Sequence, residues 1–215
     1  MLKIKTFVFN PFQENTFILY DETKECVIID AGSNDLHEKN EIYSYIGNHE
    51  LIPKFLLNTH CHIDHILGNA AILEKYAIPF LAHQEDMPLM ERANDMALAF
   101  GLNVQEPPKP SRFVADGEEI KFGNAVLEVR HVPGHSPGSV AFVANNERFV
   151  IVGDVLFKGS IGRTDLPGGD YNTLIQSIKQ KLFSLDNDFE VYPGHGDSTT
   201  IHHERFTNPF LINHS

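Results

Sequence analysis

The sequence predicts an α/β protein of two sheets packed face to face, with helices on the outside. In each half of the 215-residue chain the expected strands come first and the helices follow, and in both halves strands end at loops that carry histidines. Layers of this kind bury the apolar faces of sheets and helices in one core. A proline-rich break at residues 107–110 is only four residues long. We therefore expect a single domain over residues 1–215, with an interdomain linker at these prolines as the alternative.

Apolar and alternating runs define the elements of the first half. The expected strands cover residues 3–9, 16–20, 26–29, 54–58 and 78–82. The expected helices cover residues 34–50, 64–77 and 85–100, the first of them ended by Pro53. In the second helix, apolar residues recur at i, i+4, i+7 and i+11 from Ile66, which places them on one helical face.

The second half repeats this order with shorter segments. Hairpin-like strands are expected at residues 112–114, 119–122 and 125–130, followed by strands at 139–143, 149–152 and 189–192. One helix is expected at residues 171–183, and a turn of helix near the C-terminus.

Composition and charge exclude several classes of protein. Hydrophobic residues make up 42% of the chain and aromatic residues 10%, which is typical of a globular protein. The net charge of −12 argues against a broad basic surface for nucleic acid. The sequence has no apolar run near the roughly 18 residues of a membrane span, no secretory signal, and only two cysteines. We expect a soluble, cytoplasmic protein that binds neither nucleic acid nor membrane.

Four potential metal ligands lie within six residues, between an expected strand and an expected helix. They are His60, His62, Asp64 and His65. Side chains two apart in an extended chain project to the same side, so His60 and His62 can hold one ion. Asp64 and His65 lie where the chain turns into the helix and point to a neighbouring position. The hexapeptide therefore predicts two adjacent metal ions, with a solvated polar loop as the alternative.

Three further candidate ligands lie in loops after strands in the second half. His135, Asp154 and His195 each have a glycine as a neighbour, and glycine lets the backbone approach closely and adopt unusual φ values. With the hexapeptide they supply five histidines and two aspartates, enough for two divalent ions with an open face. This donor set suits zinc, iron or manganese, and we take zinc as the first choice.

The ordered set of these seven residues resembles the metallo-β-lactamase superfamily over nearly the whole chain, and residues 153–170 are similar to its short glyoxalase II-like hydrolases. The resemblance implies a four-layer αβ/βα sandwich with a dinuclear site between two mixed sheets. It implies a first metal bound by His60, His62 and His135. It implies a second metal bound by Asp64, His65 and His195, with Asp154 bridging the two. Asp30 would match the family's aspartate behind the ligands, with a turn residue at a strand end as the alternative.

The resemblance implies a metallo-hydrolase. Water bridging two ions about 3.5 to 4 Å apart has its pKa lowered toward 7, so the expected reaction is attack of a metal-bridging hydroxide on a thioester carbonyl. A hydroxyacyl-glutathione is the expected substrate. Asp64 is the expected catalytic residue, because it could orient this hydroxide. Arg163 and Lys158 are expected to bind an acidic substrate, although Arg163 could instead be a surface arginine or pair with Asp165.

The same ligands admit other reactions. The persulfide dioxygenases of this superfamily also carry a Gly-Arg-Thr-Asp motif like residues 162–165, and one iron would be held by His60, His135 and Asp154. A lactonase or another ester hydrolase could use the same scaffold. The acidic charge argues against a nuclease, and the lack of a signal peptide against a β-lactamase. A purely structural metal is disfavoured because structural zinc sites are usually closed and rich in cysteine. About twenty residues follow His195, so the C-terminal helical domain of full-length glyoxalase II has no counterpart here.

Overall fold

A computed structural model describes residues 1–102 and 105–212 of the chain. The chain forms two compact units. Unit 1 comprises Met1–Val114 and Lys121–Ala125, and unit 2 comprises Ala115–Ile120 and the chain from Val126 onward. Residues 107–110, considered above as a linker, lie inside unit 1. Among the described residues, no helix has the length and apolar character needed to cross a membrane.

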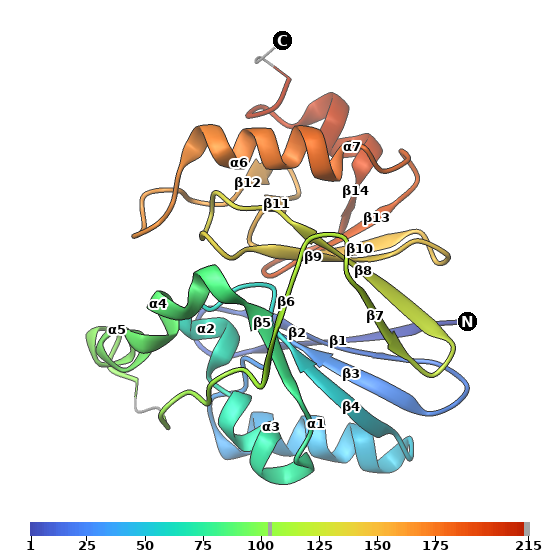
Figure 1. The fold of residues 1–215 in the computed structure, drawn as a ribbon, viewed down its shortest axis with the longest axis vertical. Helices are drawn as coiled ribbons and strands as arrows, with labels where there is room; N and C mark the ends of the chain where they lie inside the picture. Colours follow the sequence, from blue (N-terminus) through green and yellow to red (C-terminus); the bar gives the residue numbers. More distant parts are fainter. Residues whose placement is uncertain (103–104, 213–215) are drawn as a thin grey trace. The chain divides into compact units, whose positions relative to one another are not determined.

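Unit 1 is built on a six-stranded mixed sheet (Figure 1). Its strands follow the chain order and are β1 (Lys3–Phe9), β2 (Glu14–Tyr20), β3 (Glu25–Ile29), β4 (Ile52–Leu57), β5 (Phe80–His83) and β6 (Arg112–Val114). The first three pair antiparallel, whereas β3, β4, β5 and β6 run parallel to one another. The carboxyl ends of β3 and β4 therefore lie side by side, with Ile29 opposite Leu57. This places the residue after β3, Asp30, beside the loop that carries His60.

Helices α1 (Leu36–Asn48) and α3 (Asn69–Tyr76) cover one face of this sheet (Figure 1). Helix α1 begins where the Asp35 carboxylate accepts a hydrogen bond from the backbone N–H of Glu38, which satisfies one of the N–H groups at the helix start. Its buried residues Ile42 and Ile46 join the apolar core of the unit. Burying an aliphatic side chain of this size contributes about 1.5–3 kcal/mol.

The helix expected at residues 64–77 is two helices, α2 (Ile63–Ile66) and α3. The backbone N–H of Gly68 donates to the carbonyl of Ala31 at 2.7 Å, and a Cβ atom at Gly68 would lie 2.3 Å from Ser33 Oγ. This contact with the loop after β3 directs the N–H of Gly68 out of the helical pattern. Apolar spacing alone does not reveal the break.

The helix expected at residues 85–100 is likewise divided. It consists of η1 (Gln84–Asp86), α4 (Met87–Glu91) and α5 (Ala93–Ala99). Pro88 lies in the first turn of α4, a position that proline favours because its missing N–H would have no helical partner there. At Arg92 the N–H bonds three residues back, to Leu89, which closes α4.

Unit 2 contains most of a second mixed sheet, of whose strand residues Lys121, Phe122 and Ala125 belong to unit 1. Its strand order is β14 (Thr199–Thr200), β13 (Glu190–Pro193), β10 (Phe149–Gly153), β9 (Val140–Ala144), β8 (Ala125–His131) and β7 (Glu119–Phe122). Only β10 and β13 are described as a parallel pair among these strands. The strand at 112–114, expected as part of a hairpin here, is β6 of the first sheet, because it pairs in parallel with β5.

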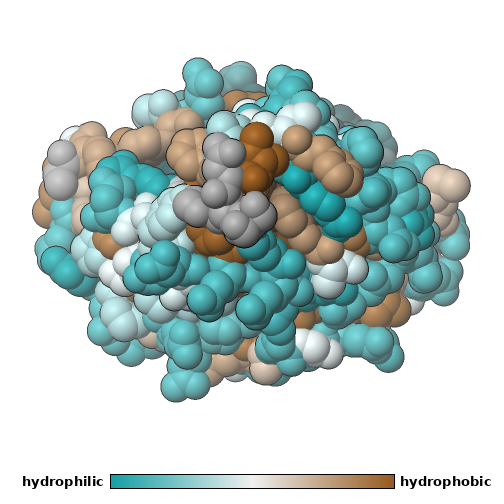
Figure 2. Space-filling model, turned by 90° about the horizontal axis from the view of Figure 1, so that it is seen from above, coloured by the Kyte–Doolittle hydropathy of each residue, from teal (hydrophilic) through white to brown (hydrophobic). Residues whose placement is uncertain are grey.

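Helices α6 (Tyr171–Ser177) and α7 (Ile201–Thr207) cover one face of the second sheet (Figure 1). Leu174 and Ile201 pack in the apolar core of this unit. The helix expected at 171–183 is α-helical to Ser177 and continues as a π-helical segment, Ile178–Leu182. A small hairpin of β11 (Leu156–Phe157) and β12 (Ser160–Ile161), not expected from the sequence, follows β10. The surface seen in Figure 2 is mainly hydrophilic, with apolar residues in small groups.

Candidate metal centre

The hexapeptide of unit 1 forms the loop between β4 and α2 and gathers its imidazoles closely. The ring centroids of His60 and His62 are 4.9 Å apart, and those of His60 and His65 are 4.1 Å apart. His60 is 2% exposed and His65 is fully buried. Asp64 Oδ2 lies 3.8 Å from His65 Nε2. The four ligands predicted from this segment therefore lie together within unit 1.

Two contacts hold the backbone of this loop. The N–H of Cys61 donates to the buried carboxylate of Asp86 at 2.8 Å. The side-chain amide of Asn10, from the turn between β1 and β2, donates to the carbonyl of Asp64 at 2.9 Å. The loop is thus fastened from two elements that are distant in sequence.

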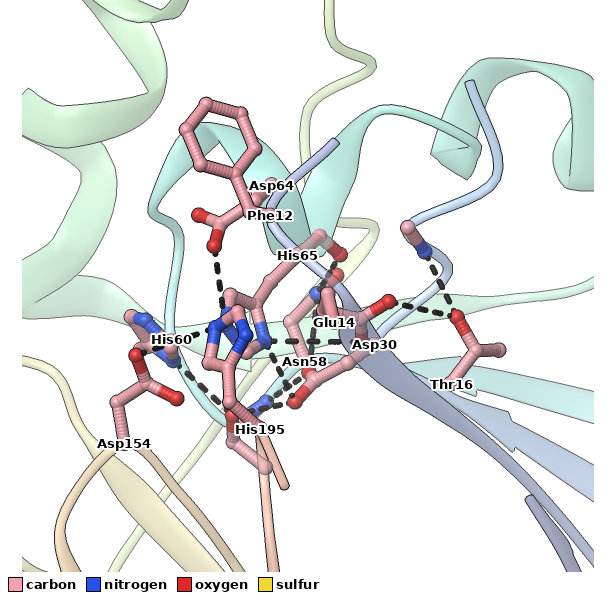
Figure 3. A network of polar contacts seen from close by, with 12 residues as sticks. Phe12, Glu14, Thr16, Asp30, Asn58, His60, Asp64, His65, Asp154 and His195 are labelled. Carbon is pink, nitrogen blue, oxygen red and sulfur yellow. Dashed lines mark hydrogen bonds and ion pairs between the residues drawn. The ribbon is translucent and has the colours of Figure 1, made fainter. Parts of the chain in front are cut away.

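Asp30 is the centre of a buried polar network behind this loop (Figure 3). Its carboxylate accepts hydrogen bonds from the backbone N–H and the hydroxyl of Thr59, at 2.7 and 2.6 Å, and from the amide of Asn58 at 3.2 Å. Its Oδ2 also lies 3.1 Å from His65 Nδ1. Asp30 has a φ of +52°, which is uncommon for a residue with a side chain. The surrounding hydrogen bonds hold it in this conformation and direct it at His65.

Thr59 links this network to His60. Its hydroxyl donates to Asp30 and lies 3.1 Å from His60 Nδ1. Because the hydroxyl proton is used toward Asp30, the oxygen accepts the Nδ1–H of His60. The same reasoning gives His65 an Nδ1–H that donates to Asp30. Both rings thereby present Nε2 as the metal-binding nitrogen, and such partners of the far ring nitrogen orient a histidine ligand and raise its basicity.

Sequence reasoning missed Glu14, which is fully buried at the start of β2. Its Oε1 lies 3.8 Å from His65 Nδ1, and its Oε2 accepts a hydrogen bond from Thr16. Burial raises the pKa of the Glu14 carboxyl well above its ordinary value, and the neighbouring Asp30 raises it further, while His65 lowers it. A Cβ atom at Gly32 would lie only 2.0 Å from Glu14 Oε2. The glycine therefore makes room for this carboxyl group.

In unit 2, Asp154 lies between two histidines. Its Oδ2 is 3.7 Å from His135 Nε2. The same oxygen is 3.5 Å from His195 Nε2 (Figure 3). His135 Nδ1 lies 2.9 Å from the backbone carbonyl of Arg163, which can only accept, so Nδ1 carries the proton and Nε2 faces Asp154. One carboxylate oxygen facing two imidazole nitrogens is the arrangement expected of a ligand shared by two ions.

The donor chemistry of both units fits divalent metal ions. Imidazole nitrogens and carboxylate oxygens are ligands of zinc, iron and manganese. In unit 1, Asp64 Oδ2 lies 3.8 Å from His65 Nε2, the ring nitrogen that does not face Asp30. In each of His60, His65 and His135, the far ring nitrogen has a hydrogen-bond acceptor built from this chain. The residues present therefore fit a metal centre.

The two residues expected to bind substrate both have carboxylate partners. Arg163, with a side chain 61% exposed, donates to the two oxygens of Asp165 at 2.7 and 2.8 Å. This is the ion pair considered above as an alternative. Lys158 Nζ lies 3.5 Å from Asp197 Oδ2, and both side chains are exposed. Each cation has to exchange or share this partner in order to bind an anionic substrate.

Comparison with known proteins identifies the family. A family model described as the metallo-beta-lactamase superfamily matches residues 9–195. Hydroxyacylglutathione hydrolase GloC of Haemophilus influenzae is 38% identical over 202 residues, covering 93% of each chain. The crystal structure of TTHA1623 in a di-iron-bound form superposes with a TM-score of 0.86 at 40% identity, covering 96% of this chain and 100% of that chain. The crystal structure of BLEG-1 B3 metallo-beta-lactamase gives a TM-score of 0.90 at 34% identity, covering 98% and 100%.

The fold and the histidine-rich loops define an α/β metallo-hydrolase. The chain belongs to the metallo-β-lactamase superfamily and has its fold, as the sequence predicts.

Proposed function

We propose that this protein hydrolyses a small thioester, of the hydroxyacyl-glutathione type, with two divalent metal ions. The observation that carries the proposal is the position of Asp154, whose single oxygen Oδ2 faces both His135 and His195. The mononuclear iron site considered above would use His60, His135 and Asp154, and it would leave His195, which faces the same Asp154 oxygen, without a metal. The thioester class is supported by the likeness to GloC over 93% of both chains.

The proposed ligand assignment follows the family pattern. His60, His62 and His135 would hold the first ion, Asp64, His65 and His195 would hold the second, and Asp154 would be shared. The family match over residues 9–195 includes all seven ligands and parts of both units, which supports the proposal that residues 1–215 act as one domain. Zinc is the proposed metal, and the di-iron form of TTHA1623 makes iron the first alternative to test.

When bound, the two ions supply a water of lowered pKa as the nucleophile and polarise the carbonyl that is attacked. The chain's own groups prepare this chemistry. Asp30, Thr59 and the carbonyl of Arg163 fix the tautomers of three histidines. We propose that Asp64 orients the nucleophile. A thiol with an ordinary pKa of about 8.5 leaves as thiolate without a strong general acid, so no further acid is required.

We further propose that Arg163 and Lys158 bind the acidic part of the substrate, and that the protein works in the cytoplasm. Cys26 and Cys61 are both buried, reduced thiols, which fits a reducing compartment. The proposed partner is a small-molecule thioester rather than a nucleic acid or a membrane.

The test combines metal analysis with turnover. The protein is purified without added metal, its metal content is measured, and S-lactoylglutathione cleavage is followed with and without oxygen. Two metals per chain and oxygen-independent cleavage support the proposal. One iron per chain with persulfide-dependent oxygen uptake would replace it by the dioxygenase.

β-Lactam hydrolysis is the second candidate, favoured by the 34% identity with BLEG-1. A chromogenic cephalosporin is therefore assayed beside S-lactoylglutathione and a lactone. Turnover of the cephalosporin with none of the thioester would identify a β-lactamase, and turnover of the lactone alone would identify a lactonase.

A further inference from the structure

Helix α7 of unit 2 carries a carboxylate that is completely buried. Glu204 is 0% exposed, and three donors surround it. The Thr199 hydroxyl donates to Oε1 at 2.6 Å, the Asn208 amide donates to Oε2 at 2.7 Å, and the backbone N–H of Gly159 donates to Oε2 at 3.0 Å. The last of these bonds crosses from α7 to the turn of the β11–β12 hairpin.

A second bond fastens the same turn. The Asn208 amide donates to the carbonyl of Ser160 at 2.9 Å, so Glu204 and Asn208 hold the N–H and the C=O of two consecutive residues. Gly159 has a φ of +70°, the left-handed conformation that a tight turn of this kind requires. A two-residue hairpin arm has few bonds of its own, so its position depends on these contacts with α7.

The hairpin is part of the segment that joins Asp154 to Arg163. Near the start of this segment, the ring centroid of Phe157 lies 6.5 Å from that of His195. Lys158 is the next residue in the chain. At the end of this segment, a Cβ atom at Gly162 would lie 1.9 Å from the backbone carbonyl oxygen of Asp154, so the two backbones are in close contact. The next carbonyl, of Arg163, is the acceptor for His135 Nδ1.

A buried carboxylate is a costly way to pack a helix, because an apolar side chain would fill the space without desolvation of a charge. One carboxylate oxygen of Glu204 instead accepts a hydrogen bond from a main-chain N–H of the hairpin. A bond between a carboxylate and a backbone N–H is directional and stronger than one between neutral groups. This favours a role in positioning the hairpin over simple packing of α7.

We propose that Glu204, together with Asn208, is a positioning residue that fixes the β11–β12 hairpin so that Lys158 and Arg163 meet the anionic part of the substrate. The kinetic part of this inference rests on the thioester hydrolysis proposed above. The mechanical part, that Glu204 orders residues 156–161, does not depend on which substrate is cleaved.

The test compares Glu204→Gln with a matched control, Glu128→Gln. Glu128, on strand β8 of unit 2, is also a hydrogen-bonded carboxylate. It accepts hydrogen bonds from Arg130 and Asn145, at 2.8 Å each, and none of its described bonds reaches the hairpin. Hydrogen exchange by mass spectrometry measures local opening at residues 156–161. Metal analysis shows whether the metal ligands are intact, and steady-state kinetics gives KM and kcat separately.

In Glu204→Gln we expect exchange in residues 156–161 to accelerate by about tenfold or more, because one carboxylate bond and its charge are lost. Metal content stays unchanged, KM for S-lactoylglutathione rises by about five- to tenfold, and kcat changes by less than about twofold, the pattern of a lost binding contact. The control shows none of these changes. Unchanged exchange in the hairpin overturns the proposal, as does faster exchange with an unchanged KM.

A second variant keeps the proposal testable if Glu204→Gln does not fold. Asn208→Ala leaves Glu204 with its bonds to Thr199 and Gly159 but removes the tie to Ser160, and we expect the same direction of change at smaller size. If the unmodified protein does not cleave the thioester, the proposed function fails. The exchange experiment then still decides whether Glu204 orders the hairpin.

Discussion

Replacement of Thr59 by valine tests the link between Asp30 and His60 with little change of side-chain volume. The buried hydroxyl donates to Asp30 at 2.6 Å and accepts from His60 Nδ1 at 3.1 Å. Valine removes both bonds and places a methyl group against a carboxylate. A buried hydrogen bond to a charged group contributes about 1.5–3 kcal/mol. The free energy of unfolding should fall by about 1–3 kcal/mol, which lowers Tm by about 2–4 °C for each kcal/mol in a chain of this size.

Metal affinity should change more specifically than stability. Loss of the partner of a ligating histidine costs about 10- to 100-fold in affinity, which corresponds to about 1.4–2.7 kcal/mol. The Thr59 hydroxyl lies against His60 Nδ1, whereas Asp30 itself lies against His65 Nδ1. The ion held by His60 should therefore bind more weakly, and the affinity for the ion held by His65 should stay nearly the same. Competition against a chromogenic chelator measures the two affinities separately. Thr59→Ser keeps the oxygen and is the control. If Thr59→Val binds both ions within about twofold of the unmodified protein, the tautomer argument for His60 is wrong.

Three further outcomes follow from individual contacts. Gly68→Ala should destabilise the fold by about 1–3 kcal/mol in urea unfolding, since its Cβ would lie 2.3 Å from Ser33 Oγ; unchanged stability would mean that the loop after β3 yields easily. Asp165→Asn should release the Arg163 guanidinium and lower KM for an acidic thioester by about two- to fivefold; a higher KM would show that Arg163 needs this partner for its orientation. Burial raises the pKa of the Cys26 thiol to about 12, so iodoacetamide should label Cys26 slowly in the folded protein even at pH 9 and rapidly after unfolding, as peptide mass spectrometry would show; rapid labelling of the folded protein would contradict this burial.

Strand and helix types are largely predictable from this sequence, because apolar residues alternate or recur with helical spacing. The helix at residues 64–77 shows the limit. Its apolar face is continuous in sequence, yet Gly68 bonds to the carbonyl of Ala31, more than thirty residues earlier, and the helix divides there. The β11–β12 hairpin has too few residues for a periodic pattern, and its order comes from α7. Local patterns do not contain such contacts.

The candidate ligands are predictable for a different reason. Histidines and aspartates with few residues between them, or beside glycines after strands, are uncommon enough to stand out. The residues behind them do not stand out. Glu14 and Asn15 lie outside the strand expected at residues 16–20, but both are buried within β2, as is Thr16. Glu14 fits only because residue 32 is a glycine, and Thr59 reaches Asp30 because β3 and β4 are neighbours.

The hydrogen-bond acceptors of the three histidine Nδ1–H groups differ in kind. This difference ranks the three imidazoles by basicity. His65 donates to a carboxylate, His60 to a hydroxyl that itself donates to the same carboxylate, and His135 to a backbone carbonyl. A charged acceptor raises the basicity of an imidazole more than a neutral one, and a hydroxyl transmits part of that charge. Of the three histidines, His65 should therefore bind a metal ion most strongly and His135 least strongly. Asp30 thus acts on His65 directly and on His60 through Thr59, whereas substitution of Thr59 interrupts only the second path.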